Sequence, residues 1–178
     1  MRRVIFVAII SLLTVGLVAA FGTAPTTHAE DLTPEQTSRV KANCSSIKTS
    51  LNQLHASDAL LRVNRGQMYE SVATKLMDRF NDRLSGDRLD NKAMTTVTGN
   101  YRTALNNFRV DYIAYEQKLA EAIRIDCVAQ PNSFHNAVVE ARALRNTVHD
   151  DVQKLHRIID DYRLSVSDFL LNFERLSR

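Results

Sequence analysis

Leu84-Ser85-Gly86-Asp87, at residues 84–87, lies midway between the only two cysteines of the chain, Cys44 and Cys127. The sequence on both sides of this stretch is typical of long amphipathic helices, and glycine suits the left-handed conformation that often ends a helix. If the chain turns back at Ser85-Gly86, the two cysteines arrive side by side at the far end of a helical hairpin. The sequence therefore predicts a disulfide between Cys44 and Cys127.

The first predicted helix covers residues 33–84. Thr33 can cap its start, Pro34 fits the first turn, and Gln36 can complete a capping box. Apolar residues then recur at steps of mostly three and four, which is the spacing of a coiled-coil seam. These seam positions are Val40, Cys44, Ile47, Leu51, Leu54, Leu61, Met68, Val72, Leu76, Phe80 and Leu84.

Two further helices are predicted, over residues 90–129 and 133–177. Gln130-Pro131 separates them, because proline disfavours helix in the residue before it. The seam of the second helix is Met94, Val97, Tyr101, Leu105, Phe108, Tyr112, Tyr115, Leu119 and Ala122. The seam of the third helix is Phe134, Val138, Ala141, Val148, Val152, Leu155, Ile159, Tyr162, Val166, Phe169, Phe173 and Leu176.

Together these patterns predict an all-α fold. We expect an elongated antiparallel three-helix bundle, up-down-up and coiled-coil-like, formed by one domain of residues 30–178 and clasped by the disulfide. About fifty helical residues span roughly 75 Å, so such a rod has a thin core. A disulfide that closes a loop of about eighty residues stabilises it by roughly 4 kcal/mol in the loop-entropy model.

Residues 1–29 have the pattern of an export signal peptide. Arg2 and Arg3 precede an almost unbroken apolar run from Val4 to Phe21, and Thr27-His28-Ala29 offers the small residues of a cleavage site. The apolar run is near the ~18 residues that span a bilayer, so a retained membrane anchor is the alternative to cleavage. We expect an exported protein that is periplasmic, on the cell surface or extracellular, where disulfides persist.

The charge is nearly balanced once this leader is set aside. The whole chain holds 23 Lys+Arg against 20 Asp+Glu, and loss of Arg2 and Arg3 with the leader leaves 21 against 20. Interspersed charges of this kind provide no basic patch for nucleic acid or for an anionic membrane surface. We therefore expect no nucleic-acid partner, and membrane contact only through an uncleaved leader.

Polar residues interrupt the predicted seam near its middle. Asp58 occupies a seam position of the first helix, and counting from the two loops places it level with about residues 113 and 149. The candidate buried polar layer consists of Asp58, Arg62, Arg65, Tyr112, Arg145 and His149. Its first interpretation is a layer that fixes helix register, and its second is a ligand pocket between helices. We favour the first, because a thin bundle leaves little of the ~300 Å³ that a pocket needs.

The sequence contains no catalytic or cofactor motif that we recognise. His149 and His156 lie seven residues apart on one helix face, but the Glu-x-x-His and His-Glu-x-x-His patterns of helical metal sites are missing. Nucleophile motifs and phosphate-binding loops are missing too, and both cysteines are assigned to the disulfide. We therefore expect a non-enzymatic protein that holds no metal or other cofactor.

Two resemblances accompany these patterns. Leu32-Thr33-Pro34-Glu35-Gln36 resembles the Leu-Thr-x-x-Gln motif of the Spy and CpxP periplasmic chaperones, which are small, exported and all-helical, although the second copy typical of that family is missing. Most of the chain after residue 29 also resembles uncharacterised exported helical-bundle proteins of candidate-phylum bacteria, a likeness that implies no activity. The stretches that carry it are Arg62-Val63-Asn64-Arg65-Gly66-Gln67-Met68-Tyr69, Ile125-Asp126-Cys127 and Arg145-Asn146-Thr147-Val148-His149-Asp150-Asp151.

Two functional hypotheses result. The first is a secreted or cell-envelope helical protein that acts as a scaffold, a spacer or a binding surface, with an unidentified protein partner or a second copy of itself. The second is a periplasmic chaperone-like or small-ligand-binding helical protein, which the opening motif and the polar layer favour.

Overall fold

The computed structural model describes residues 31–176 of the 178-residue chain, and these residues form helices and no strand. The signal-peptide prediction for residues 1–29 lies outside the described residues. The predicted all-α class is confirmed. The elements are α1 (Pro34–Ala42), α2 (Cys44–Ser71), the π-helical segment η1 (Val72–Met77), α3 (Asp78–Gly86), α4 (Lys92–Arg124) and α5 (Pro131–Leu176).

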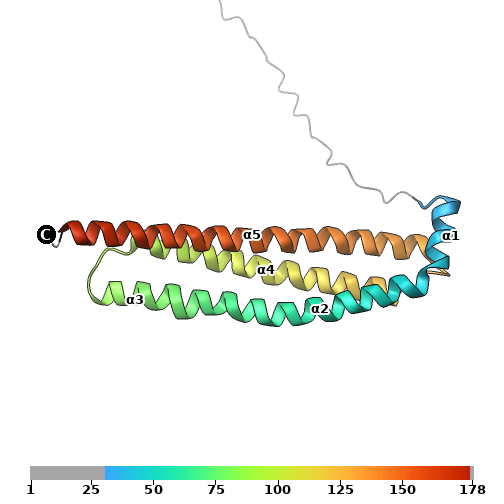
Figure 1. Ribbon diagram of the computed structural model, residues 1–178, viewed down its shortest axis with the longest axis horizontal. Helices are drawn as coiled ribbons and strands as arrows, with labels where there is room; N and C mark the ends of the chain where they lie inside the picture. The colour runs from blue at the N-terminus through green and yellow to red at the C-terminus, as the bar shows by residue number, and fades with distance from the viewer. Residues whose placement is uncertain (1–30, 177–178) are drawn as a thin grey trace, which may run out of the picture. The chain divides into compact units, whose positions relative to one another are not determined.

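The described chain reverses direction twice (Figure 1). α2, η1 and α3 follow one another along one line, residues 87–91 lead back into α4, and residues 125–130 lead into α5. α4 and α5 pack against each other along much of their length, whereas α2 packs less closely on α4 and its backbone hardly approaches α5. The arrangement is a close pair, α4 and α5, with a third line of helix laid against α4.

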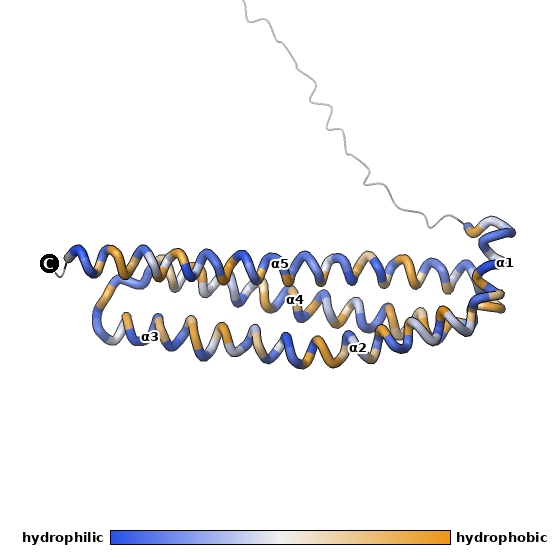
Figure 2. Tube along the Cα trace, viewed as in Figure 1, coloured by the Kyte–Doolittle hydropathy of each residue, from blue (hydrophilic) through white to orange (hydrophobic). Residues whose placement is uncertain are grey.

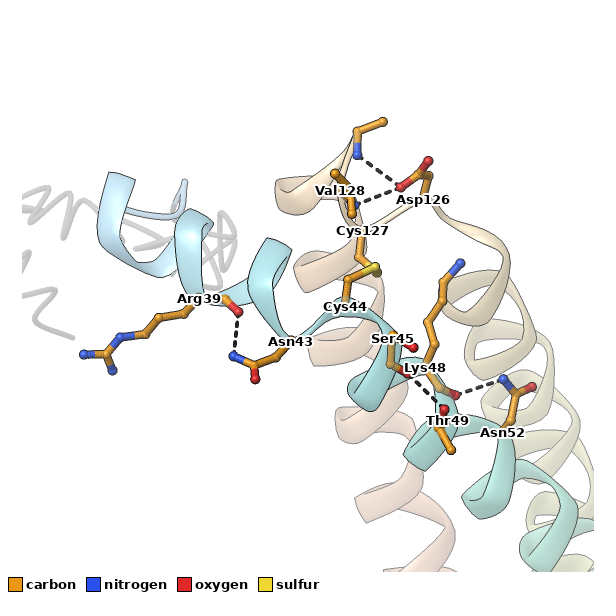
Figure 3. The surroundings of a disulfide bond; sticks show 11 residues. Arg39, Asn43, Cys44, Ser45, Lys48, Thr49, Asn52, Asp126, Cys127 and Val128 are labelled. Carbon is orange, nitrogen blue, oxygen red and sulfur yellow. Dashed lines mark hydrogen bonds between the residues drawn. A yellow bond between two sulfur atoms is a disulfide. The ribbon is translucent and has the colours of Figure 1, made fainter.

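Cys44 and Cys127 form the predicted disulfide (Figure 3). Their Cα atoms are 5.7 Å apart although the two residues are separated by 83 positions. Cys44 begins α2 and Cys127 lies in the loop between α4 and α5. In that loop the backbone N–H groups of Ala129 and Val128 donate to Asp126 Oδ1, and these bonds lower the pKa of Asp126. The disulfide therefore ties the start of α2 to the ordered turn that joins the α4–α5 pair.

The helix predicted over residues 33–84 starts as expected and is then divided. Thr33 and Gln36 form the predicted capping box at the start of α1. Asn43, with φ −101° and ψ 7°, separates α1 from α2, so that α1 turns away and contacts α5 instead. The backbone N–H of Leu32 donates to Asn132 Oδ1 at 3.3 Å, which ties the chain before α1 to the first turn of α5.

The buried faces of α4 and α5 agree well with the predicted seams. Every predicted seam residue of α4 is buried except Val97, which is half-buried. In α5 the predicted positions Phe134, Ala141, Val148, Leu155 and Tyr162 are buried. Ala137 and Ile158 are buried one position before the half-buried Val138 and Ile159 that were predicted, and Phe173 is 47% exposed. The helical periodicity therefore identified the core of α4 well and that of α5 in part.

The predicted seam of the first helix is wrong between residues 61 and 76. Leu61, Met68 and Leu76 are about half exposed, at 45%, 49% and 55%. The buried residues stand one position later than the predicted ones: Tyr69, Ala73 and Met77, at 1%, 1% and 0% exposure. One residue turns an α-helix by about 100°, so this slip moves the core face by more than a quarter turn.

The π-helical segment η1 explains how the shifted face stays in line. Tyr69, Ala73, Met77 and Asn81 are all buried and follow one another at steps of four. In an α-helix of 3.6 residues per turn, repeated steps of four drift steadily around the axis. A π-helical turn holds more residues per turn than an α-helical one, and so returns the later positions to the same face.

The turn after α3 differs from the prediction that Gly86 would be its left-handed residue. α3 continues through Gly86, and Arg88 takes the left-handed conformation, with φ 58°. Leu89 N–H donates to the Leu84 carbonyl at 2.8 Å and Arg88 N–H to the Ser85 carbonyl at 3.1 Å. These two bonds make a Schellman motif, in which a residue with a Cβ atom occupies the position that glycine usually fills.

We predict that Arg88→Gly stabilises the protein by about 1 kcal/mol, because glycine adopts this backbone conformation without the steric cost of a Cβ atom. Gly86→Ala should add about 0.5–1 kcal/mol, because Gly86 lies in helix and a Cβ atom there meets nothing within 4 Å. Urea unfolding measures both. Destabilisation by Gly86→Ala, with no gain from Arg88→Gly, would put the left-handed residue at position 86.

Candidate functional site

Over residues 58–65, the face of α2 that points toward the other helices carries charged residues, whereas the core-facing side of an amphipathic helix is usually apolar. Asp58, Arg62 and Arg65 follow at steps of four and three on the face that carries the buried Tyr69, and this face points toward α4 and α5. Leu60, on the opposite face, is 69% exposed. This part of α2 therefore turns charged side chains inward and apolar side chains outward.

Asp58 is the most buried of the inward charges, with 8% exposure. Tyr115 Oη of α4 donates a hydrogen bond of 2.7 Å to Asp58 Oδ2, and Arg145 Nε of α5 donates one of 3.1 Å to the same oxygen. Burial and the bond to Asp58 raise the pKa of Tyr115, and the bond to Asp58 also raises the pKa of Arg145. Asp58 thus joins α2 to both other long helices.

Arg62 contacts α4 through an ion pair and through a cation–π interaction. Its guanidinium group forms an ion pair with Glu116, and its Cζ atom lies 5.5 Å from the centre of the Tyr112 ring, within range of a cation–π contact. Burial, with the nearby charges of Asp58 and Glu116, raises the pKa of Tyr112 to about 12. Tyr112 therefore acts as a neutral ring beneath the arginine.

All six residues of the predicted polar layer line one groove of about 450 Å³ between α2, α4 and α5. Four of them are exposed rather than buried, which corrects the prediction of a buried layer; the four are Arg62, Arg65, Arg145 and His149. Guanidinium groups at an open rim keep the water that burial would remove, so these arginines are stable where α2 does not pack closely on α5. The groove also exceeds the ~300 Å³ that a thin bundle was expected to lack.

A second groove, of about 460 Å³, lies on the other flank of α2, against α4. Val63 and Gly66 of α2 and Ile113 of α4 line it, and it shares Arg62, Phe108 and Tyr112 with the first groove. α2 therefore has open space on both sides at this level.

The two histidines of the sequence analysis have separate partners. His149 is hydrogen-bonded to Gln153 at 2.8 Å, and His156 to the Tyr69 hydroxyl at 3.2 Å. Residues 31–176 contain no group of three or more His, Cys, Asp or Glu side chains placed to hold a metal ion. Polar and apolar residues are interspersed along the helices (Figure 2), and no helix within that range is long and apolar enough to span a bilayer.

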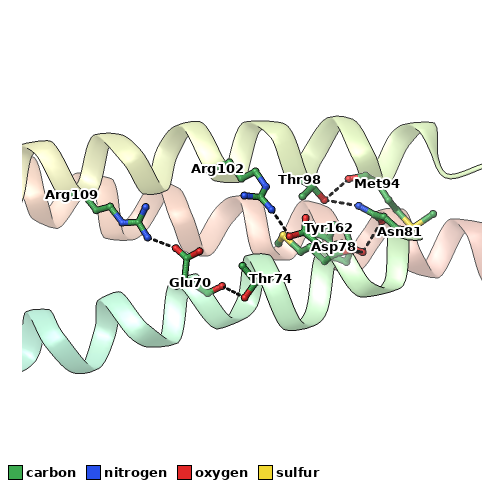
Figure 4. A network of polar contacts seen from close by, with 10 residues as sticks. Glu70, Thr74, Asp78, Asn81, Met94, Thr98, Arg102, Arg109 and Tyr162 are labelled. Carbon is green, nitrogen blue, oxygen red and sulfur yellow. Dashed lines mark hydrogen bonds and ion pairs between the residues drawn. The ribbon is translucent and has the colours of Figure 1, made fainter. Parts of the chain in front are cut away.

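A buried polar network that the sequence did not predict lies near the α3 end of the bundle (Figure 4). Asn81 Nδ2 donates to Thr98 Oγ1 at 2.9 Å, and Tyr162 Oη donates to Asn81 Oδ1 at 3.0 Å. The three side chains belong to α3, α4 and α5 and are 5–6% exposed. Asn81 is adjacent to the predicted seam residue Phe80, so only the shifted core face of this helix would have revealed it.

A pair of carboxyl groups also lies between α4 and α5. Asp151 Oδ2 is buried and has no hydrogen-bond donor among the described residues. Burial, followed by the hydrogen bond and the charge of the neighbouring Asp111, raises the pKa of Asp151 to about 6. Lys154 opposes this shift and Asp150 adds to it. Ionisation of Asp151 therefore destabilises the contact between α4 and α5, because it places a charge in a buried position next to Asp111.

No family model, no curated protein and no solved structure matches the chain. The geometry of the described residues therefore carries the functional inference.

We predict that Asp58 and Tyr115 are coupled in a double-mutant cycle. Asp58→Asn and Tyr115→Phe should each destabilise the protein by about 1–3 kcal/mol, with a coupling energy of about 1 kcal/mol. Arg145→Gln should cost less than about 1 kcal/mol, because 53% of the Arg145 side chain is exposed. Urea unfolding provides the energies, with the exposed Asp82→Asn as the control. Because the amide oxygen of Asp58→Asn can still accept a hydrogen bond, Asp58→Ala completes the cycle. Additive effects of Asp58→Ala and Tyr115→Phe would contradict the hydrogen bond.

We also predict a pH-dependent effect of Asp151→Asn. The pKa of Asp151 is raised from 3.8 to about 6 in the folded state, so protonated Asp151 contributes stability that is complete below about pH 3.8 and lost as the pH rises through about 6. Asp151→Asn should raise the thermal midpoint above pH 7 and leave it nearly unchanged near pH 4. The exposed Asp168→Asn is the control. An equal effect of Asp151→Asn at both pH values would contradict the raised pKa.

Proposed function

We propose that this protein is a non-enzymatic, exported helical protein that serves as a scaffold or binding surface for another protein. The disulfide supports an oxidising compartment, because such bonds persist outside the cytosol. The pattern of residues 1–29 adds an export signal to this proposal. If the leader is cleaved, the binding surface belongs to a released protein. If the leader is retained as an anchor, the same surface is displayed at the membrane.

The architecture that we propose for this role is an antiparallel three-helix bundle, up-down-up and packed in the manner of a coiled coil. The two chain reversals and the heptad spacing of the buried residues in α4 and α5 support it. Ends held by the disulfide and by the Asn81 network would give the bundle the rigidity that a spacer or scaffold needs.

The exposed apolar face of α2 is the observation that carries the proposal. Leu60 is 69% exposed and lies on the outer face of the same segment that turns Asp58 inward. Val63 is 54% exposed and lies between this face and the second groove. Exposed apolar side chains that cluster on one element are typical of protein-binding surfaces. The partner is another protein or a second copy of this chain.

A second candidate function is a small-ligand carrier or a chaperone-like protein. The groove of about 450 Å³ favours it, because binding sites for small molecules have volumes of ~300–1,000 Å³. The capping box at Thr33 and Gln36 belongs to the motif that resembles the periplasmic chaperones.

A photo-crosslinking residue placed at Leu60 tests the first proposal, with one at Val139, an equally apolar residue of α5 that is 46% exposed, as the matched control. We expect an adduct with one partner, or with a second copy, from position 60 and not from position 139. Excess Val139→Glu protein should compete for it, and excess Leu60→Glu/Val63→Glu protein should not.

Equal adducts from both positions, or no adduct from either, would contradict the proposed α2 surface. Suppression of aggregation of a heat-denatured client protein, without any discrete adduct, would favour the chaperone-like function instead.

A further inference from the structure

We propose that the groove between α2 and α5 binds a small amphipathic anion, with a carboxylate head and an aliphatic chain. This inference rests on the second function proposed above, ligand carriage, and is independent of a protein partner on the outer face of α2. Arg62, Arg65, Arg145 and His149 are exposed at the rim of the groove. Its inner wall consists of the buried Phe108, Tyr112, Tyr115 and Val148 together with the carboxylate of Asp58.

The charge of the groove favours an anion. Three guanidinium groups, of Arg62, Arg65 and Arg145, line it, and the ion pairs that they make involve only Asp58 and Glu116. Arg65 makes no ion pair among the described residues and lies beside the Tyr69 hydroxyl. Arg65 is exposed, so its donors are accessible from solvent. The arginines and their acidic partners therefore leave one positive charge uncompensated, and it belongs to Arg65.

The hydrogen-bonding geometry of arginine favours a carboxylate as the head group. A guanidinium group has five N–H donors in a fixed fork, which matches the two oxygens of a carboxylate. Arg145 already binds Asp58 in this manner, through Nε at 3.1 Å and Nη2 at 3.5 Å. A ligand carboxylate at Arg65 would make the corresponding contact on the α2 side of the groove.

The apolar residues of the groove favour an aliphatic chain in the ligand. Leu61 of α2, Phe108 of α4, and Val148 and Val152 of α5 supply apolar walls next to the arginines. Leu61 is 45% exposed, and an aliphatic chain bound in the groove would remove this surface from water. A ligand that is charged at one end and apolar along its length therefore satisfies both halves of the groove.

Isothermal titration calorimetry of the oxidised protein with decanoate, below micelle-forming concentrations, tests this inference. We expect binding of one decanoate per chain, and binding at least about tenfold weaker for decanol and decyltrimethylammonium, which lack the anionic head. Decyl phosphate and vesicles of anionic phospholipid distinguish a free carboxylate from a lipid head group. Tighter binding to vesicles than to decanoate would overturn the proposal that the ligand is a free carboxylate, and would identify a lipid head group instead.

Two arginine variants locate the site. Arg65→Gln should weaken decanoate binding about tenfold, whereas Arg79→Gln, at an exposed arginine of α3 outside the groove, should leave it unchanged. Equal effects of the two variants, or equal binding of decanoate and decanol, would overturn the inference. Absence of any decanoate binding would also overturn it, while a crosslink from position 60 would still support the protein-binding function.

Discussion

The inward charges of α2 are the constraint on which the rest of the structure depends. A buried carboxylate must be paired or hydrogen-bonded, and Asp58 meets this requirement with Tyr115 and Arg145. Arginines are stable only where part of the guanidinium group remains hydrated or paired, so Arg62 and Arg65 hold α2 at a distance from α5. The groove between α2, α4 and α5 is the direct consequence.

Each end of the α2–α3 line has an attachment of its own to α4 and α5. Cys44 is bonded covalently to Cys127 at one end. Near the other end, Asn81 is hydrogen-bonded to Thr98 and to Tyr162. Such a helix can open or admit a ligand at its centre without losing its position, which suits the binding functions proposed for both faces of α2.

The sequence was informative where apolar residues recur without ambiguity. The α4 seam, much of the α5 seam and the disulfide were predictable, because heptad spacing marks a buried face and the symmetric placement of two cysteines about a turn brings them together. The capping box at Thr33 was predictable because its chemistry is local. All six candidate site residues also lie in one groove, since counting from the two loops gave a nearly correct helix register.

The remaining features depend on tertiary packing. Met68 and Tyr69 are adjacent, and both have large apolar side chains, so periodicity alone could not decide which of them faces the core. Nothing in the sequence marks the π-helical turn that follows them. Arg88 takes the left-handed position because α3 continues two residues further than the glycine suggests. The exposure of the arginines could not be predicted, because only the assembled helices show that α2 packs less closely on its neighbours than α4 and α5 pack on each other.

Native-state hydrogen exchange of the oxidised protein tests the loose docking of α2 most directly. Backbone amides of residues 58–68 should exchange about a hundredfold faster than those of residues 108–119 in α4, through local opening that low urea concentrations do not accelerate. Equal protection of the two segments, with exchange of both only through global unfolding, would contradict the idea that inward charges hold the middle of α2 away from the α4–α5 pair.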